Sequence, residues 1–519
     1  MHDLSLEAKV GQMMMFGFPG TEIPNHIRQF IEEYNLGGII IFSRNVQSPV
    51  QITELNSKLQ ELAFGSPFGV GLFIAVDQEG GPVARITDGV SVAPAQMAIG
   101  ALHSPEKAYQ IAKTVGQELA AMGFSINLAP CVDVNNNPHN PVIGVRSFGE
   151  DPLQVAELGI AAVRGYQESV IATAKHFPGH GDTAVDSHLG LPVIPHSRER
   201  LFEVELVPFQ KTIAAGVEAI LAAHVVFPAI EPTPGLPGSL SHTVLTKLLR
   251  QELGFNGLIM TDCMEMQAVT KHYTMGEAAV LAVEAGNDLV LVSHTPELQA
   301  EAFWAVVNAV RSGRISEDRI DESLARIAQA KRAYVQWPFP AAAVGAPQSL
   351  ELMAEVYAAS MTIVRNRGLI PLPATRPVTV IETRGQAASL AEDAARVSIT
   401  LAQALADFGA EVTAYYISSQ VTDAEYKKIT GLVKPHDLVI MVTQDAHRYP
   451  GQAKLADYVT ATCPEHVIVG ARTPYELGQM PHASTYLAAY SSRPEALRQA
   501  AAVLVGRGQA QGSLPVTLA

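Results

Sequence analysis

Residues 171–188 read IATAKHFPGHGDTAVDSH, a short apolar run followed by a polar loop, and this stretch sets the interpretation of the whole chain. The run 171–174 is apolar and partly β-branched, as is typical of a buried strand that ends at Lys175 or His176. The loop 175–188 contains two glycines, one proline, three histidines and two aspartates. Because polar groups are costly to bury unless they are paired or used, this loop is the first place to look for chemistry.

An apolar run followed by an amphipathic segment occurs eight times before residue 336. Continuous apolar strands fit a parallel sheet that is buried on both faces, and eight strand–helix units predict a closed (β/α)8 barrel of the TIM type. The alternative is a doubly wound open sheet, but residues 16–20, FGFPG, lack its glycine fingerprint. The predicted strands occupy residues 11–18, 38–42, 71–76, 124–130, 171–175, 219–225, 257–261 and 288–292.

A second unit is expected after residues 337–347, WPFPAAAVGAP, where three prolines and small residues are typical of a linker. We expect a catalytic barrel over 1–336 and a smaller α/β sandwich domain over 348–519. Few strand ends of the second unit carry clustered titratable groups, which favours a packing and support role. Its predicted strands are 378–382, 411–416, 438–443 and 466–470, with a helix over 390–408.

The composition limits the kinds of binding partner and the cellular compartment that we expect for this protein. A formal charge of −15 without any run of Lys or Arg disfavours nucleic acid and anionic membranes as partners. Three scattered cysteines, Cys131, Cys263 and Cys463, indicate no disulfide framework and fit a reducing compartment. No signal peptide and no membrane-spanning run are visible, so we expect a cytoplasmic protein.

Polar residues follow most of the predicted strands. In a barrel of this type the active site lies at the carboxyl ends of the strands. We therefore expect one site built from strand ends and the loops that follow them. Its candidates are Asp77, Arg146, Lys175, His176, His188, His224 and Asp262.

Asp262 directly follows the seventh predicted strand and should point into the barrel mouth. A carboxylate there can act as a nucleophile, a base or a metal ligand, although Asp is also common as a helix N-cap. Glu265 is a weaker acid candidate, and Cys263 is interpreted as packing.

The segment Asp186-Ser187-His188 places a carboxylate two residues from an imidazole. In an extended loop both side chains point the same way, so the carboxylate can orient the imidazole and make it a proton carrier near neutral pH. The alternative is a loop held only by local hydrogen bonds. The glycines before this segment indicate that the loop moves into place over a substrate.

Two further groups of charged residues lie on other strand ends. Residues 77–81, DQEGG, with Arg85 suit hydrogen bonding to sugar hydroxyls, or form a salt bridge on a tight turn. Lys175 and His176 either clamp hydroxyl groups or are simply buried and paired.

A metal site is the rival interpretation of the same residues. Barrel metallohydrolases usually carry His-x-His after the first strand, whereas this chain has Phe16-Gly17-Phe18 there. We therefore expect no metal and no other cofactor. The ligands considered are His176, His180, Asp186, His188, His224 and Asp262.

Taken together, these motifs resemble glycoside hydrolase family 3, and the Asp-Ser-His form of the loop is similar to its β-N-acetylglucosaminidase branch. The resemblance rests on KHFPGHG at 175–181, DSH at 186–188, DQEGG at 77–81, RSFG at 146–149 and TDCM at 261–264. The tail resembles the family's C-terminal sandwich domain more weakly, through NRGLIPL at 366–372 and GSLPV at 512–516.

The resemblance implies a role for each matching residue. Asp262 matches the catalytic nucleophile, His188 the acid/base and Asp186 its orienting partner. Pro82 stands where the family often has Arg, but Arg85 keeps its offset from Asp77, so we expect the sugar contacts to survive. The residues that match the N-acetylglucosamine-binding −1 subsite are Asp77, Arg85, Arg146, Lys175 and His176.

The implied reaction is a retaining hydrolysis that releases terminal N-acetyl-β-D-glucosamine through a covalent glycosyl-enzyme. The resemblance also implies muropeptide substrates, a role in peptidoglycan turnover and cell-wall recycling, and a monomer. A neutral imidazole base would not repel an anion, so phosphorolysis at the same site is the alternative, and a barrel metallohydrolase is a more distant one.

Overall fold

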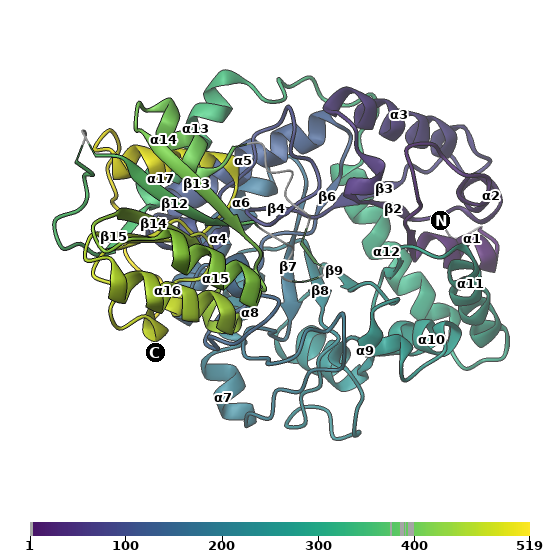
Figure 1. Ribbon diagram of the computed structural model, residues 1–519. Coiled ribbons are helices and arrows are strands. Elements are labelled where there is room, and N and C mark those ends of the chain that lie inside the picture. Colours follow the sequence, from purple (N-terminus) through teal and green to yellow (C-terminus); the bar gives the residue numbers. More distant parts are fainter. Residues whose placement is uncertain (1–3, 374–375, 385–388, 390, 393–398, 519) are drawn as a thin grey trace.

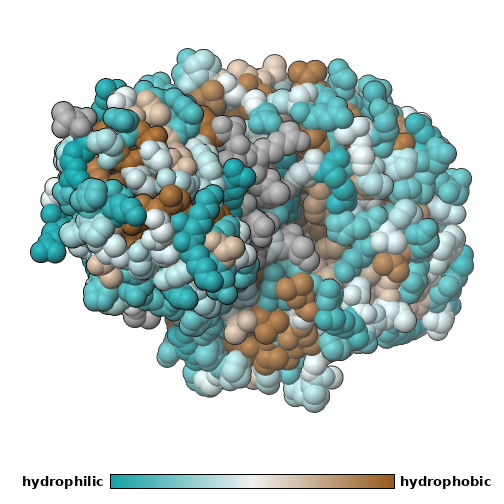
Figure 2. Space-filling model, in the orientation of Figure 1, coloured by the Kyte–Doolittle hydropathy of each residue, from teal (hydrophilic) through white to brown (hydrophobic). Residues whose placement is uncertain are grey.

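The computed structural model describes residues 4–373, 376–384, 389, 391–392 and 399–518. It contains two α/β units, a barrel and a smaller open sheet, which lie against each other (Figure 1). On the face drawn in Figure 2 the surface is hollowed between the two units, and hydrophilic residues cover most of the outer surface. No helix in these ranges is long and apolar enough to cross a membrane.

The first sheet has eight strands in the order β10-β1-β2-β3-β6-β7-β8-β9, and every neighbouring pair is parallel. A parallel bridge between Met260 and Leu289 joins the two ends of this order, so the predicted barrel is confirmed. Every residue of these strands is buried, which explains why most of them are apolar. The strands are β1 Met14–Phe16, β2 Gly38–Ile41, β3 Phe73–Val76, β6 Ile126–Asn127, β7 Ile171–Phe177, β8 Ala219–Ala222, β9 Leu258–Thr261 and β10 Val290–Val292.

Helices connect the strands and surround the barrel (Figure 1). Most begin at a Ser, Thr or Asp cap or at a proline in the first turn, both of which suit a helix N-terminus. They are α1 Leu6–Gln12, α2 Asn25–Tyr34, α3 Pro49–Gly65, α5 Pro105–Ala121, α6 Pro152–Tyr166, α7 Arg198–Glu203, α8 Val207–Ala214, the π-helix η4 Thr243–Glu252, α10 Met275–Ala285, α11 Pro296–Arg311 and α12 Glu317–Tyr334.

Seven of the eight predicted barrel strands are shorter in the structure, two of them by five residues, and the fifth extends to Phe177. The first predicted strand, 11–18, begins only at Met14 because Gly11 and Gln12 close helix α1, where a side chain on Gly11 would collide with the Tyr34 carbonyl. The fourth, 124–130, narrows to β6, although Leu128 still donates its backbone N–H to β3. Apolar runs therefore overstate the length of a strand where a buried helix or loop adjoins it.

The loops at the carboxyl ends of the strands carry short elements of their own. The hairpin of β4 Gln78–Gly80 and β5 Val83–Ala84 follows β3, and α4 Gln96–Gly100, η2 Gly144–Arg146 and α9 Gln267–Thr270 lie in other loops. Gly80 and Gly81 have φ values of 100° and 53°. A Cβ at either would lie 2.6–2.7 Å from Ala93 or Ala95 atoms, so the hairpin turn requires glycine.

The second sheet has the order β11-β16-β15-β14-β12-β13, with β11 antiparallel to β16 and the other pairs parallel. The four predicted strands of this unit are present, but β11 and β16 were missed because they are short. The strands are β11 Thr362–Arg365, β12 Val378–Thr383, β13 Val412–Ile417, β14 Leu438–Thr443, β15 His466–Gly470 and β16 Tyr486–Ala488.

Helices α13 Pro347–Ser360, α14 Leu401–Asp407, α15 Asp423–Leu432, α16 Pro450–Thr462 and α17 Pro494–Leu504 flank this sheet. Of the helix predicted over 390–408, the described part is helical only from Leu401, and residues 390 and 393–398 lie outside the described residues.

The two units share a buried core and direct hydrogen bonds. One apolar cluster runs from the barrel through Met353 and Tyr357 into the second unit. The Tyr357 hydroxyl donates to the Ala93 carbonyl at 3.1 Å, and Asn135 exchanges hydrogen bonds with the Tyr475 hydroxyl. The second unit is therefore fixed beside the loops at the carboxyl ends of the strands. Whether the chain divides at 337–347 stays a prediction.

Candidate active site

A cavity of about 540 Å³ opens at the carboxyl ends of the barrel strands. Ala391 and Glu392 of the second unit form part of its wall, and Arg85 donates to the Ala391 carbonyl at 2.9 Å. Seven of the residues that the sequence assigned to the site line the cavity, and Asp186 lies behind one of them, His188. The seven are Asp77, Arg85, Arg146, Lys175, His176, His188 and Asp262.

A network of ion pairs forms one wall. The Lys175 ammonium lies 2.8 Å from Asp77 Oδ1 and 2.5 Å from Glu79 Oε1. Arg146 donates through Nη2 and Nε to both oxygens of Glu79, at 2.8 and 2.9 Å. Arg85 Nη2 lies 3.2 Å from Asp77 Oδ2. Each charge thus has at least one opposite partner, which buried charges require.

This pairing fixes the protonation of the network. Burial alone would raise the pKa of Asp77 and Glu79, but the charges of Lys175, Arg85 and Arg146 outweigh it. The pKa of Asp77 therefore lies well below its usual range, and that of Glu79 falls to about 2. The pKa of Lys175 is raised because the two carboxylates outweigh the effect of its burial. At neutral pH all these groups are charged, so Asp77 presents an acceptor to a ligand.

Strand β7 contributes two consecutive residues to the cavity. In a regular strand Lys175 and His176 would point to opposite faces. Here the register with β8 shifts between Lys175 and Phe177, and both side chains line the cavity. The peptide bond between Lys175 and His176 is cis. The shift in register between β7 and β8 accompanies the placement of both side chains in the cavity.

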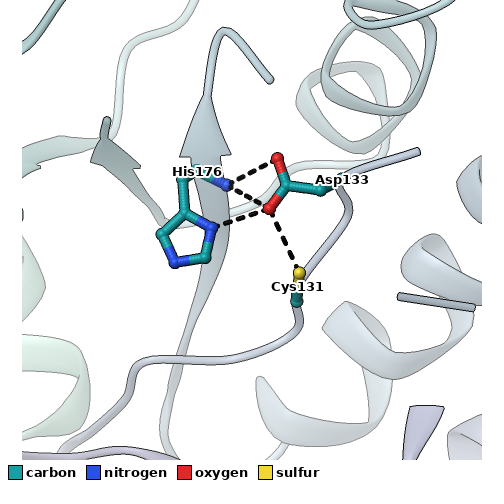
Figure 3. Close-up of side chains that lie close together, drawn as sticks. All are labelled: Cys131, Asp133 and His176. Carbon is teal, nitrogen blue, oxygen red and sulfur yellow. Dashed lines mark hydrogen bonds and ion pairs between the residues drawn. The ribbon is translucent and has the colours of Figure 1, made fainter. Parts of the chain in front are cut away.

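Asp133 holds the ring of His176, as Figure 3 shows. His176 Nδ1 lies 2.7 Å from Asp133 Oδ2, and the backbone N–H groups of His176 and His180 donate to the same carboxylate. Arg146 Nη2 lies 3.2 Å from His176 Nε2. Because a guanidinium only donates, Nε2 accepts and Nδ1 carries the hydrogen. Asp133 was not among the residues predicted from the sequence; the available signal was an acid just beyond the fourth strand.

The structure also shows which possible metal ligands lie close together. In the described part of the chain, three groups bring ligand atoms of His, Cys, Asp or Glu within 4.8 Å of one another. Of the six ligands considered from the sequence, only His176 belongs to such a group, with Cys131 and Asp133. Cys131 and His176 already hydrogen bond to Asp133 (Figure 3), so these three atoms are joined without an ion.

The Asp186–His188 pair has the predicted form. His188 Nδ1 lies 2.7 Å from Asp186 Oδ1, which also accepts the His188 backbone N–H at 2.9 Å. Burial raises the pKa of Asp186, but the hydrogen bonds and charge of His188 lower it overall. Asp186 thus stays ionised and holds Nδ1, so Nε2 is the nitrogen that can exchange a proton with a ligand.

His180 fastens the loop that carries this pair. Its ring bonds to Thr183 Oγ1 at 2.9 Å and to Ser187 Oγ at 3.0 Å. Burial and the neighbouring His176 lower its pKa to about 4, so the ring is neutral. A Cβ on Gly181 would lie 1.8 Å from the Val134 carbonyl oxygen. Glycine at position 181 therefore allows the loop to pack closely against the backbone of Val134.

Asp262 lies directly after β9 and does not cap a helix. Helix α9 begins at Gln267 with Met266 at its N-cap, whereas Asp262 Oδ1 accepts the N–H of Cys263 at 2.7 Å. Burial raises the pKa of Asp262, but nearby His224, His176 and His188 lower it overall. The site thus presents an ionised carboxylate whose other oxygen is available to a ligand.

His224 supports the segment after β9. Its Nε2 lies 3.1 Å from the Cys263 carbonyl and its Nδ1 lies 2.6 Å from Ser239 Oγ. A carbonyl accepts, so Nε2 carries the hydrogen. Burial lowers the pKa of His224, which keeps the ring neutral.

Glu265 and Cys263 also line the cavity. Both oxygens of Glu265 accept backbone N–H groups, from His294 at 2.6 Å and Thr295 at 3.0 Å, at the start of helix α11. Burial raises the pKa of the Cys263 thiol to about 12, so it stays protonated. This agrees with its interpretation as packing.

The arrangement suits an enzyme that acts on carbohydrates. An ionised carboxylate, Asp262, and a carboxylate-held imidazole, His188, line one barrel cavity beside fixed charges that can hydrogen bond to hydroxyl groups.

Comparison with known proteins identifies the family. The model of the glycosyl hydrolase family 3 N-terminal domain matches residues 5–330. Beta-hexosaminidase A of Pseudoalteromonas piscicida is 31% identical over 563 residues, covering 96% of this chain and 92% of that protein. Beta-hexosaminidase of Stenotrophomonas maltophilia strain K279a is 37% identical over 303 residues, covering 57% of this chain and 87% of that protein.

A solved structure agrees with these relatives. The glycoside hydrolase family 3 beta-N-acetylglucosaminidase of Paenibacillus sp. str. FPU-7 superposes with a TM-score of 0.93 at 42% identity, covering 99% of each chain. The chain described here therefore belongs to glycoside hydrolase family 3.

Proposed function

We propose that this enzyme is a retaining exo-β-N-acetylglucosaminidase that releases terminal non-reducing N-acetyl-β-D-glucosamine. The observation that carries the proposal is the Asp186–His188 pair on the wall of the cavity that also contains Asp262. Such a pair supplies the acid/base within the barrel itself. The names of the Paenibacillus and Pseudoalteromonas relatives support the same activity.

Asp77, Lys175, Arg85, Arg146 and His176 would hold the sugar in the −1 subsite. Asp77 offers an ionised acceptor, and Lys175 and the arginines offer charge-assisted donors to hydroxyl and acetamido oxygens. Because Glu79 and Asp133 brace these groups from behind, little reorganisation is needed when a sugar binds.

In the first step Asp262 attacks the anomeric carbon. A bond forms between its carboxylate oxygen and that carbon, while the bond to the glycosidic oxygen breaks. Protonated His188 gives its Nε2 proton to the departing oxygen, and ionised Asp186 stabilises the imidazolium before transfer. The product of this step is a covalent glycosyl-enzyme and a free alcohol.

In the second step neutral His188 takes a proton from water as the water oxygen attacks the anomeric carbon. The bond to Asp262 breaks, which regenerates the carboxylate and leaves His188 protonated for the next cycle. Two displacements at the same carbon retain its β configuration.

The proposed natural substrates are muropeptide fragments that carry N-acetylglucosamine. Support for this part comes from the likeness of the acid/base loop to the β-N-acetylglucosaminidase branch of the family. Turnover of purified muropeptides that exceeds turnover of chitobiose would agree with it, and the reverse order would contradict it.

Trapping the intermediate tests the mechanism. A 5-fluoro N-acetylglucosaminyl fluoride should inactivate the enzyme, and peptide mass spectrometry should locate the label on Asp262. A label on another residue would overturn the assignment. Comparing products in phosphate and in a phosphate-free buffer of equal ionic strength separates hydrolysis from phosphorolysis, since only phosphorolysis yields the sugar 1-phosphate.

A further inference from the structure

The loop that carries Asp186 and His188 has its two ends joined outside the catalytic cavity. Asp182 lies near the start of the loop and His196 at its end, just before α7. His196 Nε2 lies 2.7 Å from Asp182 Oδ2. Both side chains are partly exposed, at 23% for Asp182 and 32% for His196. The pair is thus reachable from solvent.

Glu205, between α7 and α8, is the third member of this cluster. One ligand atom from each of Asp182, His196 and Glu205 lies within 4.8 Å of the other two. The Glu205 side chain is only 1% exposed, and its Oε2 atom has no hydrogen-bond partner in the described part of the chain. A buried carboxylate oxygen left without a partner is costly, so it points to a missing positively charged ligand.

The other recorded neighbours of Glu205 contact Oε1 and leave Oε2 without a partner in the described part of the chain. Its Oε1 atom accepts from Asn136 at 3.3 Å and lies 3.4 Å from Arg200, whose side chain is 37% exposed. The side-chain oxygen of Asn136 is also buried and unpartnered. A second unsatisfied oxygen therefore lies beside the same carboxylate.

We propose that Asp182, His196 and Glu205 bind a divalent cation of the zinc class. One imidazole and two carboxylates are donors that Zn²⁺ accepts, and water or Asn136 can complete a tetrahedron. The cation takes the place of the proton between His196 and Asp182, and it neutralises the two carboxylates. Ligand atoms on one Zn²⁺ lie about 3–4 Å apart, so small side-chain movements close the site.

The cation would tie the acid/base loop to the barrel. Asp182 and His196 belong to the two ends of the loop, whereas Glu205 belongs to the segment between two barrel helices. Gly179 already packs on Glu205, where a Cβ would lie 2.9 Å from the Glu205 Cβ. Binding at this point restricts the base of the loop without touching Asp262. The inference does not depend on the proposed function.

Calorimetric titration of Zn²⁺ into EDTA-treated full-length protein tests the site. We expect saturable binding that His196→Gln, a partly exposed change, weakens by about tenfold or more. The double variant Cys263→Ser, His294→Gln removes the other partly exposed ligand cluster and should leave this binding in place. Binding that is unchanged in both His196→Gln and Glu205→Gln would overturn the proposal.

The proposed restriction of the loop by the bound cation can be measured without an activity assay. Zn²⁺ should slow proteolytic cleavage or amide hydrogen exchange of residues 182–196 in the wild type but not in His196→Gln. Circular dichroism would establish that each variant is folded before comparison. Mg²⁺ should give little protection, because it favours octahedral sites of oxygen ligands. Equal protection by Mg²⁺, or Zn²⁺ binding without protection, would contradict this restriction.

Discussion

The two polar regions of the cavity are built in opposite ways. In the wall formed by Asp77, Glu79, Lys175 and Arg146, each charge is paired across different loops, and Lys175 and Glu79 are almost fully buried. Asp186 and His188 instead bond to each other two residues apart, and the His188 side chain is 21% exposed. The groups of the wall stay charged because long-range pairs fix them, whereas His188, which we propose exchanges protons, keeps one nitrogen accessible.

The largest expected effect belongs to Asp262, which both regions serve. Asp262→Ala should lower kcat/KM on an aryl N-acetyl-β-glucosaminide by about 10⁴-fold, since no nucleophile remains. Added azide should restore turnover and yield the α-glycosyl azide, because it attacks from the vacated face. The exposed Asp318→Asn is the matched control. Near-normal activity of Asp262→Ala would refute the assignment.

Replacing His188 should reduce activity far more than it reduces folding stability. His188→Ala should lower kcat/KM about 10²- to 10⁴-fold for poor leaving groups and much less for dinitrophenyl glycosides, which need little protonation. Its unfolding free energy should fall by about 1–2 kcal/mol, because buried Asp186 loses the imidazole but keeps the backbone N–H of residue 188. Equal losses for both leaving groups would remove His188 from the acid role.

Replacing Lys175 should reduce folding stability strongly as well as activity. Lys175→Met leaves Asp77 and Glu79 short of a positive partner, so the unfolding free energy should fall by about 3–5 kcal/mol in addition to lost activity. Urea denaturation at neutral pH measures this difference against His188→Ala. Comparable stability of the two variants would show that the two regions do not differ as described.

The smallest expected effect is the loss of folding stability at low pH. The pKa of folded Glu79, about 2, lies below its ordinary value of 4.5. Ionised Glu79 therefore stabilises the fold above pH 4.5, and this contribution, about 3 kcal/mol, is lost as pH falls toward 2. Lys175→Met should lose less stability across that interval than the wild type does. A wild-type stability independent of pH there would contradict the pairing.

The strand–helix repeat predicted the barrel because each strand is buried on both faces and so is mostly apolar. The same logic placed Asp77, Lys175 and Asp262 at strand ends. Sequence patterns could not pair Glu79 with Arg146, or Asp133 with His176, because these partners are 67 and 43 residues apart in the chain. Such pairs exist only once neighbouring strands are brought together.

Short elements were missed for a related reason. Strand β16 has three residues and β11 pairs with it antiparallel, so neither carries a periodic signal of its own. The N-cap interpretation of Asp262 also required knowing where α9 begins, which local propensity does not determine. The sequence thus predicted candidate residues that line one cavity, but not the partners that support them.

The contact of Arg85 with the Ala391 carbonyl bears on how this enzyme can be engineered. Arg493 also donates to the Gly81 carbonyl, and Pro515 accepts the N–H of Glu150, so the last residues of the chain lie against the catalytic loops. Truncation after the barrel would strip these partners from the cavity wall. The cavity of this chain is therefore completed by its second unit, and fusions or circular permutations should preserve these contacts.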